Sequence, residues 1–491
     1  MKPLVVIENT KRWHFTIPDV DVVSARAYLT EPRYAELRRT TVYNLCRRYG
    51  YQGLGYYVSL LAAARGHKPM PSVATIQALQ LSPILRIVGE DLDDLIQRNL
   101  APLKSESFEL SIYFGRNLAK RYDRLSRALF NQFPAPFLRA SFVWEDKRWK
   151  LQGLRAIATS DIPEAHQDFV MAEAARYFAK PKHARRAKPQ VARYDLAILW
   201  NPVDEDAPSW ERSIKKFIAA GQDVGIAATV IGPEDYGRIA EFDALFIREV
   251  TSVDHHTFRF AQRAATEGLI VVDDPESIIR CSNKVYQAEL FDRYDLPCPK
   301  TMVVHEDNVE EVAAAIGFPC VVKLPDSSFS QGVIKIEQGH DQFVECLKQV
   351  FEQSDLAIVQ EWLPTGFDWR IGVLNREVLY VCKYHMARGH WQIISGRPGR
   401  RRYGKVEAVA LEDAPARAVE LGVKAASLVG DGLYGVDVKE IDGKFRIIEI
   451  NDNPSIDAGY EDTILGDQLY LAIMQYFRTK LDERGVAPAR L

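Results

Sequence analysis

Residues 433–455 read LYGVDVKEIDGKFRIIEINDNPS, and this stretch decides how the C-terminal part of the chain folds. Apolar and polar residues alternate on both sides of Gly443, which predicts two antiparallel strands joined by a tight turn. If the hairpin is centred on Gly443, with a loop of three or five residues, Asp437 lies directly opposite Glu449. Asn451 then shares their face of the hairpin.

Opposed carboxylates repel each other, and burial increases the cost of that repulsion. A hard divalent cation removes the conflict, because carboxylate and amide oxygens beside phosphates are the ligands that Mg²⁺ prefers. The register around Gly443 therefore predicts a magnesium site. A two-residue turn at 442–443 would instead place Asp437 opposite Ile448, and the hairpin would then be an ordinary solvated one.

Two earlier segments carry lysines where a polyphosphate could bind. Residues 320–336 read CVVKLPDSSFSQGVIKI, a buried strand that ends at Lys323, a Ser/Gly loop and a returning strand. The loop lacks the spacing of a P-loop, so it would be a different phosphate clamp. Lys284 follows Asn283 at the start of a helix predicted over 284–294, where its charge opposes the helix dipole. Taken alone, the loop fits an ordinary hairpin loop equally well, and Lys284 is better explained as a solvated surface lysine.

A third segment, AIVQEWLP (357–364), is an apolar strand that turns polar at its end. Free backbone groups beside an apolar wall can hold a flat base such as adenine. Asp368, a few residues further on, could accept hydrogen bonds from ribose hydroxyls. Taken alone, this pattern is better explained as an ordinary strand end.

Residues 191–280 alternate apolar strands with helical stretches, which is typical of βαβ units on a parallel sheet. A dinucleotide site would need G-x-G-x-x-G after the first strand, but residues 201–204 read NPVD, so such a site is disfavoured. The predicted strands cover 194–200, 225–231, 242–247 and 269–272, and the predicted helices cover 210–220 and 257–266.

Residues 1–180 predict an α+β region without a βαβ rhythm and without a recognisable catalytic constellation. The expected elements are a strand at 4–8, helices over 34–49 and 56–64, and a hairpin of 137–144 with 148–157. The basic, proline-flanked stretch 181–189 predicts an exposed linker.

Composition limits the class of protein. The 491 residues are 47% hydrophobic and 26% charged with a net charge of −3, which predicts several globular domains and no general attraction to nucleic acid or anionic membranes. The six cysteines form no C-x-x-C pair, which argues against a zinc site or a disulfide framework. No signal peptide or spanning segment is recognisable, so we expect a cytoplasmic protein.

Together, the motifs resemble the ATP-grasp carboxylate–amine ligases, in particular the RimK-type branch, over residues 191–491. The resemblance is most specific in 280–301, 321–333, 359–373 and 435–457. It implies a multidomain α/β and α+β fold. The implied parts are an N-terminal α+β extension (1–180), a linker (181–190), a Rossmann-like pre-ATP-grasp domain (191–280), an ATP-grasp lid subdomain (281–358) and a metal-binding subdomain (359–491).

The resemblance also implies roles for single residues. The phosphates of ATP would be contacted by Lys284 and Lys323 and covered by a mobile lid that includes Ser330, Gln331 and Gly332. Adenine would be held by the hinge residues Gln360, Glu361, Trp362 and Leu363, with Asp368 on the ribose. The side chains that would face the reacting groups are Arg370, Lys383 and Arg401. The metal ligands would be Asp437, Glu449 and Asn451.

The implied activity is ATP-dependent amide formation through an acylphosphate, adding an amino acid such as glutamate to a peptide, protein or small-molecule carboxylate. The expected cofactors are ATP and Mg²⁺, with Mn²⁺ as the alternative, and we expect a homo-oligomer without nucleic-acid or membrane partners. The alternatives are a silent ATP-binding regulator and a scaffold that binds partners through residues 1–180. Two departures from the family pattern, GRPGRRRYG at 396–404 and Ser455 in place of a glycine, concern the amino-acid substrate rather than ATP.

Overall fold

The computed structural model describes residues 2–10, 20–37, 40–81, 85, 88–89, 92–178, 192–204, 206–326, 332–337, 339–395 and 402–486. Among them, the chain forms two compact units. The first unit comprises the described residues up to 178 together with Glu234–Glu241, and the second comprises the remainder. The linker predicted over 181–190 lies outside the described residues.

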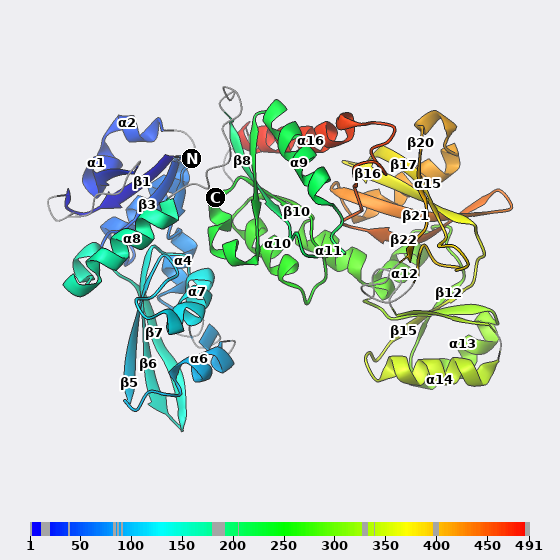
Figure 1. Ribbon diagram of the computed structural model, residues 1–491, viewed down its shortest axis with the longest axis horizontal. Helices are drawn as coiled ribbons and strands as arrows, with labels where there is room; N and C mark the ends of the chain where they lie inside the picture. Colours follow the sequence, from blue (N-terminus) through cyan, green and yellow to red (C-terminus); the bar gives the residue numbers. More distant parts are fainter. Residues whose placement is uncertain are drawn as a thin grey trace. The chain divides into compact units, whose positions relative to one another are not determined.

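The first unit contains a parallel sheet in the order β2-β1-β3-β4 (Figure 1). Two predictions are therefore wrong: β3 occupies part of the helix expected over 34–49, and the region does contain strand–helix–strand units. β3 reads TTVYN, and all of its residues are buried. A short strand buried on both faces shows no alternation, so its periodicity does not distinguish it from a helix. The strands are β1 Lys2–Ile7, β2 Asp21–Ser24, β3 Thr40–Asn44 and β4 Lys68–Met70.

The rest of the first unit matches expectation more closely. The predicted hairpin is confirmed as β6 and β7, which complete an antiparallel sheet with β5, and the second predicted helix is confirmed as α3. These strands are β5 Ser107–Tyr113, β6 Phe137–Glu145 and β7 Arg148–Ala156. The helices are α1 Ala25–Thr30, α2 Pro32–Ala35, α3 Leu54–Ala64, α4 Val73–Ala78, α6 Asp93–Leu100, α7 Asp123–Gln132 and α8 Gln167–Phe178.

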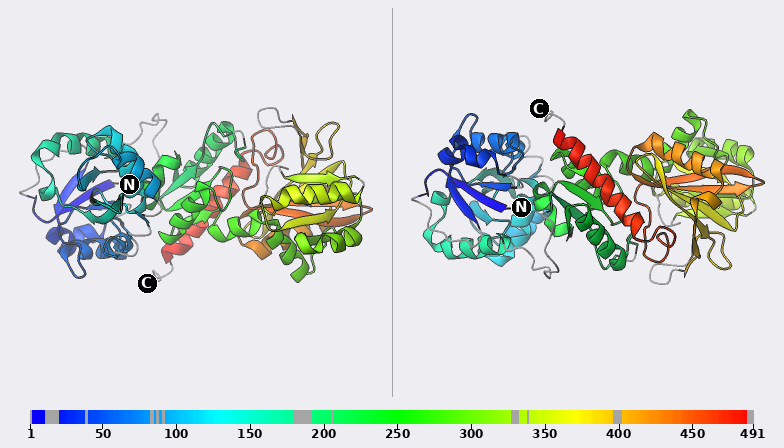
Figure 2. Two further views of the ribbon diagram at one scale, coloured as in Figure 1. Left: turned by 90° about the horizontal axis from the view of Figure 1, so that it is seen from below. Right: turned by 90° about the horizontal axis from the view of Figure 1, so that it is seen from above.

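The second unit begins with the predicted parallel sheet, in the order β11-β10-β8-β9. Within this sheet, β9 lies next to β8 on one side and β10 lies next to β8 on the other, so the direction in which strands are added reverses at β8. Ligands bind beyond the carboxyl ends of the strands at such a switch point. Helix α16 lies beside α9 (Figure 2). The elements are β8 Tyr194–Leu199, α9 Glu211–Asp223, β9 Ile226–Ile231, β10 Ala244–Ile247, α10 His256–Thr266, β11 Ile270–Val272 and α16 Asp467–Val486.

Two further sheets of the second unit are antiparallel, so the predicted mixture of α/β and α+β architecture is confirmed. The four-stranded sheet β12-β15-β13-β14 carries α13 and α14, and the five-stranded sheet β20-β17-β16-β21-β22 carries α15 (Figure 1). The four-stranded part comprises α11 Pro275–Ser282, α12 Lys284–Arg293, β12 Thr301–Val304, α13 Val309–Ile316, β13 Cys320–Lys323, β14 Val333–Ile336, α14 His340–Phe351 and β15 Ala357–Glu361. The five-stranded part comprises β16 Phe367–Leu374, β17 Glu377–His385, β20 Val406–Val409, α15 Ala416–Val429, β21 Leu433–Ile441 and β22 Lys444–Asn451, with the short pair β18 Ile394–Ser395 and β19 Arg402–Tyr403.

In the described part of the chain, no helix has both the length and the apolar content needed to cross a bilayer.

Candidate active site

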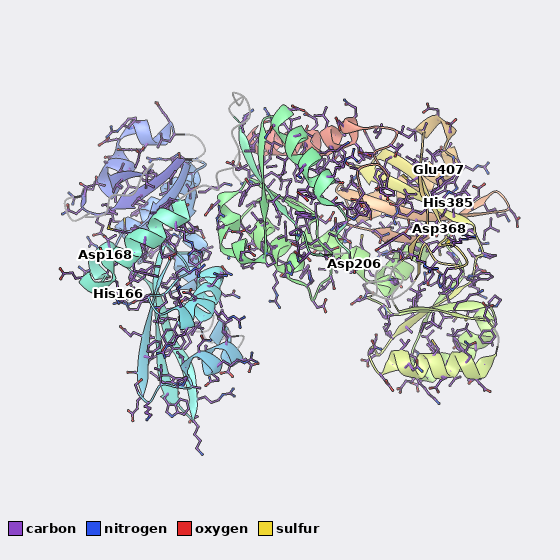
Figure 3. The ribbon with its side chains drawn as sticks, viewed as in Figure 1. His166, Asp168, Asp206, Asp368, His385 and Glu407 are labelled. Atoms are coloured by element: carbon purple, nitrogen blue, oxygen red, sulfur yellow. The ribbon has the colours of Figure 1, made fainter. Side chains whose placement is uncertain are left out.

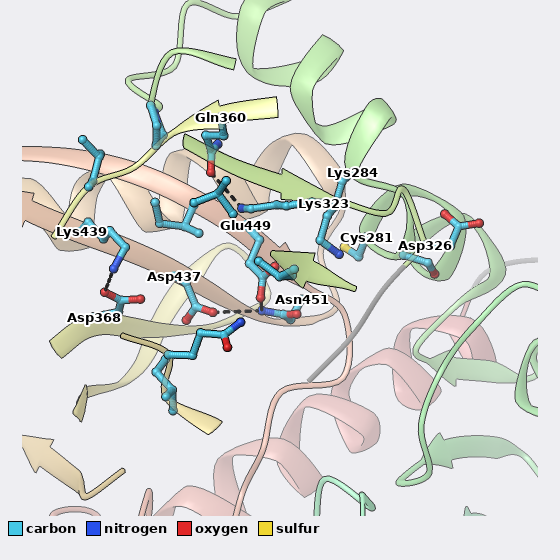
Figure 4. A pocket seen from close by; sticks show the side chains of 18 of the residues that line it. Cys281, Lys284, Lys323, Asp326, Gln360, Asp368, Asp437, Lys439, Glu449 and Asn451 are labelled. Carbon is cyan, nitrogen blue, oxygen red and sulfur yellow. Dashed lines mark hydrogen bonds and ion pairs between the residues drawn. The ribbon is translucent and has the colours of Figure 1, made fainter. Parts of the chain in front are cut away.

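A cavity of about 270 Å³ lies inside the second unit. One face of the five-stranded sheet provides its floor, and the four-stranded sheet and the loops after β8 and β10 contribute to its walls (Figure 4). The polar floor residues are Asp368, Asp437, Lys439, Glu449 and Asn451. The segments that sequence analysis singled out separately therefore meet at one place.

The hairpin β21–β22 pairs Asp437 with Glu449, as predicted, but by a different route. The turn is the two-residue one, with Asp442 and Gly443 both left-handed at φ 49° and 70°. Such a turn alone would place Asp437 opposite Ile448. A bulge shifts the register between Asp437 and Val438, leaves Ile448 as the extra residue, and brings Glu449 opposite Asp437.

The opposed carboxylates have cationic neighbours. Arg370 donates to both oxygens of Asp437, at 2.5 and 3.0 Å, and the Asn451 amide lies 3.4 Å from each carboxylate. Burial raises the pKa of Asp437 to about 6, although Arg370 opposes that rise. Burial also acts to raise the pKa of Glu449, but Lys284, Lys323 and Arg370 together lower it. Glu449 is therefore the better-stabilised anion of the two.

Two lysines face this cluster, the buried Lys323 and the partly buried Lys284. Lys323 donates to the Gln360 side chain at 2.8 Å, and Gln360 in turn donates to Thr301 at 2.9 Å. Burial lowers the pKa of Lys323 to about 8 and also lowers the pKa of Lys284, in both cases against the attraction of Glu449. Because burial penalises both ammonium groups, an anionic ligand would stabilise their charged forms.

Asn283 accounts for the position of Lys284. Its side chain accepts from the backbone N–H groups of Val285 and Tyr286 and caps α12. It also donates to Asp326 at 2.6 Å, which fixes the helix start against the loop after β13. The lysine is thereby held at the cavity wall (Figure 4).

The third lysine, Lys439, was missed by sequence analysis. Its ammonium lies 2.6 Å from Asp368 and 2.5 Å from the Thr365 hydroxyl (Figure 4). Lys439 follows Asp437 by two residues on the same strand, so strand alternation alone would have placed it on the cavity floor.

The predicted hinge residues line the cavity, but their side chains differ in role. Gln360 holds Lys323, whereas Glu361 accepts from the Lys300 backbone at 2.8 Å and pairs with Arg446. The Trp362 ring is covered by the Lys335 ammonium, 3.4 Å from the ring centroid. Trp362 and Leu363 therefore supply the apolar wall.

The end of the cavity next to the parallel sheet is acidic. Asp452 lines it, and one of its carboxylate oxygens has no hydrogen-bond partner among the described residues. Burial raises the pKa of Asp452 to about 7 and the pKa of the neighbouring Asp273 well above its ordinary value. The buried cation there, Arg248, donates to Ser209, Asn453 and backbone carbonyls instead.

Several predicted residues are not brought to the cavity. Lys383 pairs with Trp369 in the sheet, so it projects from the face opposite Asp368, and its ammonium lies 5.0 Å from the Trp369 ring centroid. Its strand β17 continues to His385, which lies 3.5 Å from Glu407 (Figure 3). Arg370 does not line the cavity but supports Asp437, and Gly332 lies at the return of the lid loop. Ser330, Gln331 and Arg401 lie outside the described residues.

The donor set fits a hard divalent cation. Two carboxylates and one amide converge, and phosphate oxygens of a bound nucleotide would complete the coordination. Among the residues described, no group of three His, Cys, Asp or Glu side chains forms a metal site by itself. A cation here would therefore depend on the nucleotide, which is common for Mg²⁺.

Two family models match the chain. Residues 25–173 match the RimK-like ATPgrasp N-terminal domain, and residues 281–469 match the RimK-like ATP-grasp domain. The alpha-aminoadipate–LysW ligase LysX of Saccharolobus solfataricus is 24% identical over 278 residues, covering 52% of this chain and 92% of that protein. The tetrahydromethanopterin:alpha-L-glutamate ligase of Methanosarcina acetivorans is 24% identical over 250 residues, covering 44% of this chain and 74% of that protein.

Among solved structures, a RimK domain ATP-grasp protein from Sphaerobacter thermophilus aligns with a TM-score of 0.44 at 17% identity, covering 57% of this chain and 98% of that one. One of the two family models falls in each compact unit. The family predicted from the sequence motifs is confirmed: the chain belongs to the RimK-like ATP-grasp proteins and carries their N-terminal domain before the ATP-grasp domain.

Proposed function

We propose that the protein is an ATP-dependent carboxylate–amine ligase that joins an amino acid to an acceptor carboxylate and releases ADP and phosphate. The observation that carries this proposal is the charge pattern of the cavity. The buried Lys323 and the partly buried Lys284 face two carboxylates and an amide across a space next to Trp362 and Leu363 of the hinge. This combination suits a nucleotide base, its polyphosphate and a divalent cation bound together.

The reaction needs no covalent side-chain nucleophile. The acceptor carboxylate attacks the γ-phosphorus, the bond to the ADP oxygen breaks, and an acylphosphate forms. The amine nitrogen then attacks the acyl carbon, phosphate leaves, and the amine proton passes to solvent. Lys284 and Lys323 would hold the phosphates, and Gln360 would orient Lys323.

Asp437, Glu449 and Asn451 would hold Mg²⁺ against the phosphates, where the cation supplies charge neutralisation. Arg370 holds Asp437 in place through a two-point contact. We propose Mg²⁺ rather than Mn²⁺, which titration of activity with each metal would test.

The amine substrate is proposed to be an α-amino acid, with glutamate as the first candidate, because curated relatives are named as alpha-L-glutamate ligases. The acceptor is proposed to be a carboxylate on a peptide, a protein or a small molecule. Intact-mass screening of such acceptors with ATP and each amino acid would identify both substrates.

Product analysis tests the proposed chemistry directly. Hydroxylamine, added with acceptor and ATP but no amine, is expected to trap the acylphosphate as a hydroxamate, with ADP as the nucleotide product. Stoichiometric AMP would contradict attack at the γ-phosphorus. ATP binding without phosphate release, over the full set of amines and acceptors, would favour a regulatory role instead.

We also propose that the protein acts in the cytoplasm as a homo-oligomer and without nucleic acid. All six cysteines are free thiols, which is compatible with a reducing compartment. Light scattering of the purified chain, alone and with RNA, would test the last two points.

A further inference from the structure

Tyr384 is a buried side chain beside the proposed metal site, and neither the motifs nor the resemblance gave it a role. On β17 it pairs with Asp368 of β16, so it lies diagonally across from Arg370 on the same face of the sheet. Tyr384 is 7% exposed and Arg370 is 8% exposed. The guanidinium carbon of Arg370 lies 4.6 Å from the centroid of the Tyr384 ring. An aromatic face attracts a cation at this distance, most strongly where water is excluded.

Arg370 is therefore held between two groups, the Asp437 carboxylate and the Tyr384 ring. Its donation to both oxygens of Asp437 fixes the orientation of that carboxylate. Gly435 leaves the space that the arginine needs, because a Cβ atom there would lie 3.0 Å from Cδ of Arg370. With the guanidinium confined in this way, a displacement of the Tyr384 ring is passed on to Asp437.

The Tyr384 ring is itself fixed by a buried carboxylate. Its hydroxyl donates to Oε1 of Glu461 at 2.6 Å, and Oε2 of Glu461 accepts from the Asp457 backbone N–H at 2.7 Å. Glu461 is 3% exposed, and both of its oxygens have the partners that burial requires. Glu461 and Asp457 belong to the segment that follows Asn451. That segment is bound in turn to the start of α9, where the Trp210 backbone N–H donates to Asp457 at 2.7 Å.

We propose that Tyr384 is a positioning residue of the metal site, with its ring holding Arg370 against Asp437 and Glu461 holding the ring. Asn451 is fixed by β22, and the segment after it fixes Asp437 through Glu461 and Tyr384. The ligands from β21 and β22 are thus held in one geometry by contacts outside the cavity. Mg²⁺ demands near-ideal octahedral geometry, so a displaced ligand costs affinity for the cation. This inference rests on the proposed function, from which it takes the cation site.

Calorimetric titration with ATP, once in saturating Mg²⁺ and once in EDTA, tests the inference. Tyr384→Leu is expected to weaken ATP binding about tenfold in Mg²⁺, because the ring no longer holds Arg370, and to leave the affinity in EDTA unchanged. Tyr384→Phe keeps the ring and should lose only about threefold in Mg²⁺. Tyr380→Phe is the matched control. This buried tyrosine of the same strand donates to the Ser455 carbonyl at 3.1 Å, and loss of its hydroxyl should change neither affinity.

A further variant covers the possibility that Tyr384→Phe leaves Glu461 buried without its donor and disturbs the fold. Tyr384→Phe combined with Glu461→Gln removes that charge, and it is expected to match Tyr384→Phe in Mg²⁺, because both substitutions break the same contact. Equal weakening of ATP binding in Mg²⁺ and in EDTA would indicate a loosened fold and would overturn the inference. Unchanged ATP affinity of Tyr384→Leu in Mg²⁺ would overturn this inference alone. Wild-type ATP affinity that is the same in Mg²⁺ and in EDTA would overturn the cation site of the proposed function as well.

Discussion

The two units of the chain differ in what they bury. Among the described residues, the buried polar side chains of the first unit are uncharged or histidine, such as Asn44, Ser59 and His67. The second unit buries charges of both signs. These are Arg248, Glu249, Asp273, Lys323, Asp368, Arg370, Asp437, Asp452, Glu461 and Asp462.

Burying a charge costs far more than burying a hydrogen-bonded neutral group. Asn44 illustrates the cheaper solution, since its amide donates to Gly55 and Ser59 and its oxygen accepts from Cys46. Lys323 illustrates the costly one, because its nearest partner is an uncharged amide. The buried polar groups of the first unit are therefore satisfied by uncharged partners, whereas Lys323 of the second unit keeps a buried charge that an anionic ligand could pair with.

The largest effect is expected from Glu449→Gln. Loss of this carboxylate removes one proposed metal ligand and the anion that attracts both Lys284 and Lys323, so ATP-dependent phosphate release should fall by about 100-fold to 1000-fold. Near-normal turnover with Mg²⁺ would show that the second unit does not hold the metal here.

Asp437→Asn is a less clean variant, because it leaves Arg370 buried without its two-point partner, at a cost of about 3 kcal/mol. Circular dichroism should therefore show Glu449→Gln folded as the wild type is, and Asp437→Asn less stable.

Lys323→Met is expected to weaken ATP binding by about 10-fold to 100-fold, measured by calorimetry. Methionine keeps most of the apolar stem of Lys323 and removes its ammonium group, the pKa of which is lowered by burial to about 8. The folded pKa lies below the unfolded one, so the charged lysine destabilises the fold below pH 8, and the variant should melt at the same or a higher temperature at pH 7.

Asn44→Ala is the matched control from the first unit. It should lower the melting temperature of that unit and leave ATP affinity unchanged, because every residue that lines the cavity belongs to the second unit. Unchanged ATP affinity in Lys323→Met would contradict the contrast between the two units.

Much of the second unit could be predicted from the sequence because its strands and turns carry local signals. The βαβ alternation and the polar strand ends are readable in the residues themselves. The pairing of Asp437 with Glu449 was also predicted, but the loop lengths that led to it were not the ones the chain uses. The bulge at Ile448 has no local signature, because an Ile-Ile pair fits a regular strand equally well.

The first unit was harder to predict for a physical reason. β3 is buried throughout, and a short, fully buried strand is distinguished from a helix by its neighbours in the sheet rather than by its own residues. Similarly, the contact between Lys439 and Asp368 depends on strand pairing across β16 and β21, far apart in sequence. Asp452 was read only as part of a motif, and its unpartnered carboxylate oxygen is visible only in the folded chain.

Asp452→Asn is expected to change how the stability of the second unit depends on pH. Burial raises the pKa of Asp452 to about 7, so its contribution is fully present below the unfolded pKa of about 4 and is lost as the pH rises to 7. Removing the carboxyl group should reduce the slope of this loss of stability between pH 5 and 7 by at most about 1.4 kcal/mol per pH unit. Asp355→Asn, an exposed carboxylate of the same unit, should leave the slope unchanged in hydrogen-exchange measurements.

The smallest effect, and one of opposite sign, is expected from His67→Gln in the first unit. Nε2 of His67 lies 2.9 Å from the Leu37 carbonyl and therefore donates to it, so Nδ1 accepts from the Tyr28 hydroxyl at 2.8 Å. Protonation of Nδ1 would break the second bond, and burial, with Arg65 nearby, lowers the pKa of His67. The contribution of His67 to the stability of the first unit is therefore present above the unfolded pKa of about 6.5 and is lost as the pH falls below that value.

Glutamine can make both hydrogen bonds without titrating, so the variant should reduce the acid sensitivity of the first unit in peptide-resolved hydrogen exchange. Asp452→Asn should leave that sensitivity unchanged, and a first unit that gains stability on acidification would contradict the assigned tautomer.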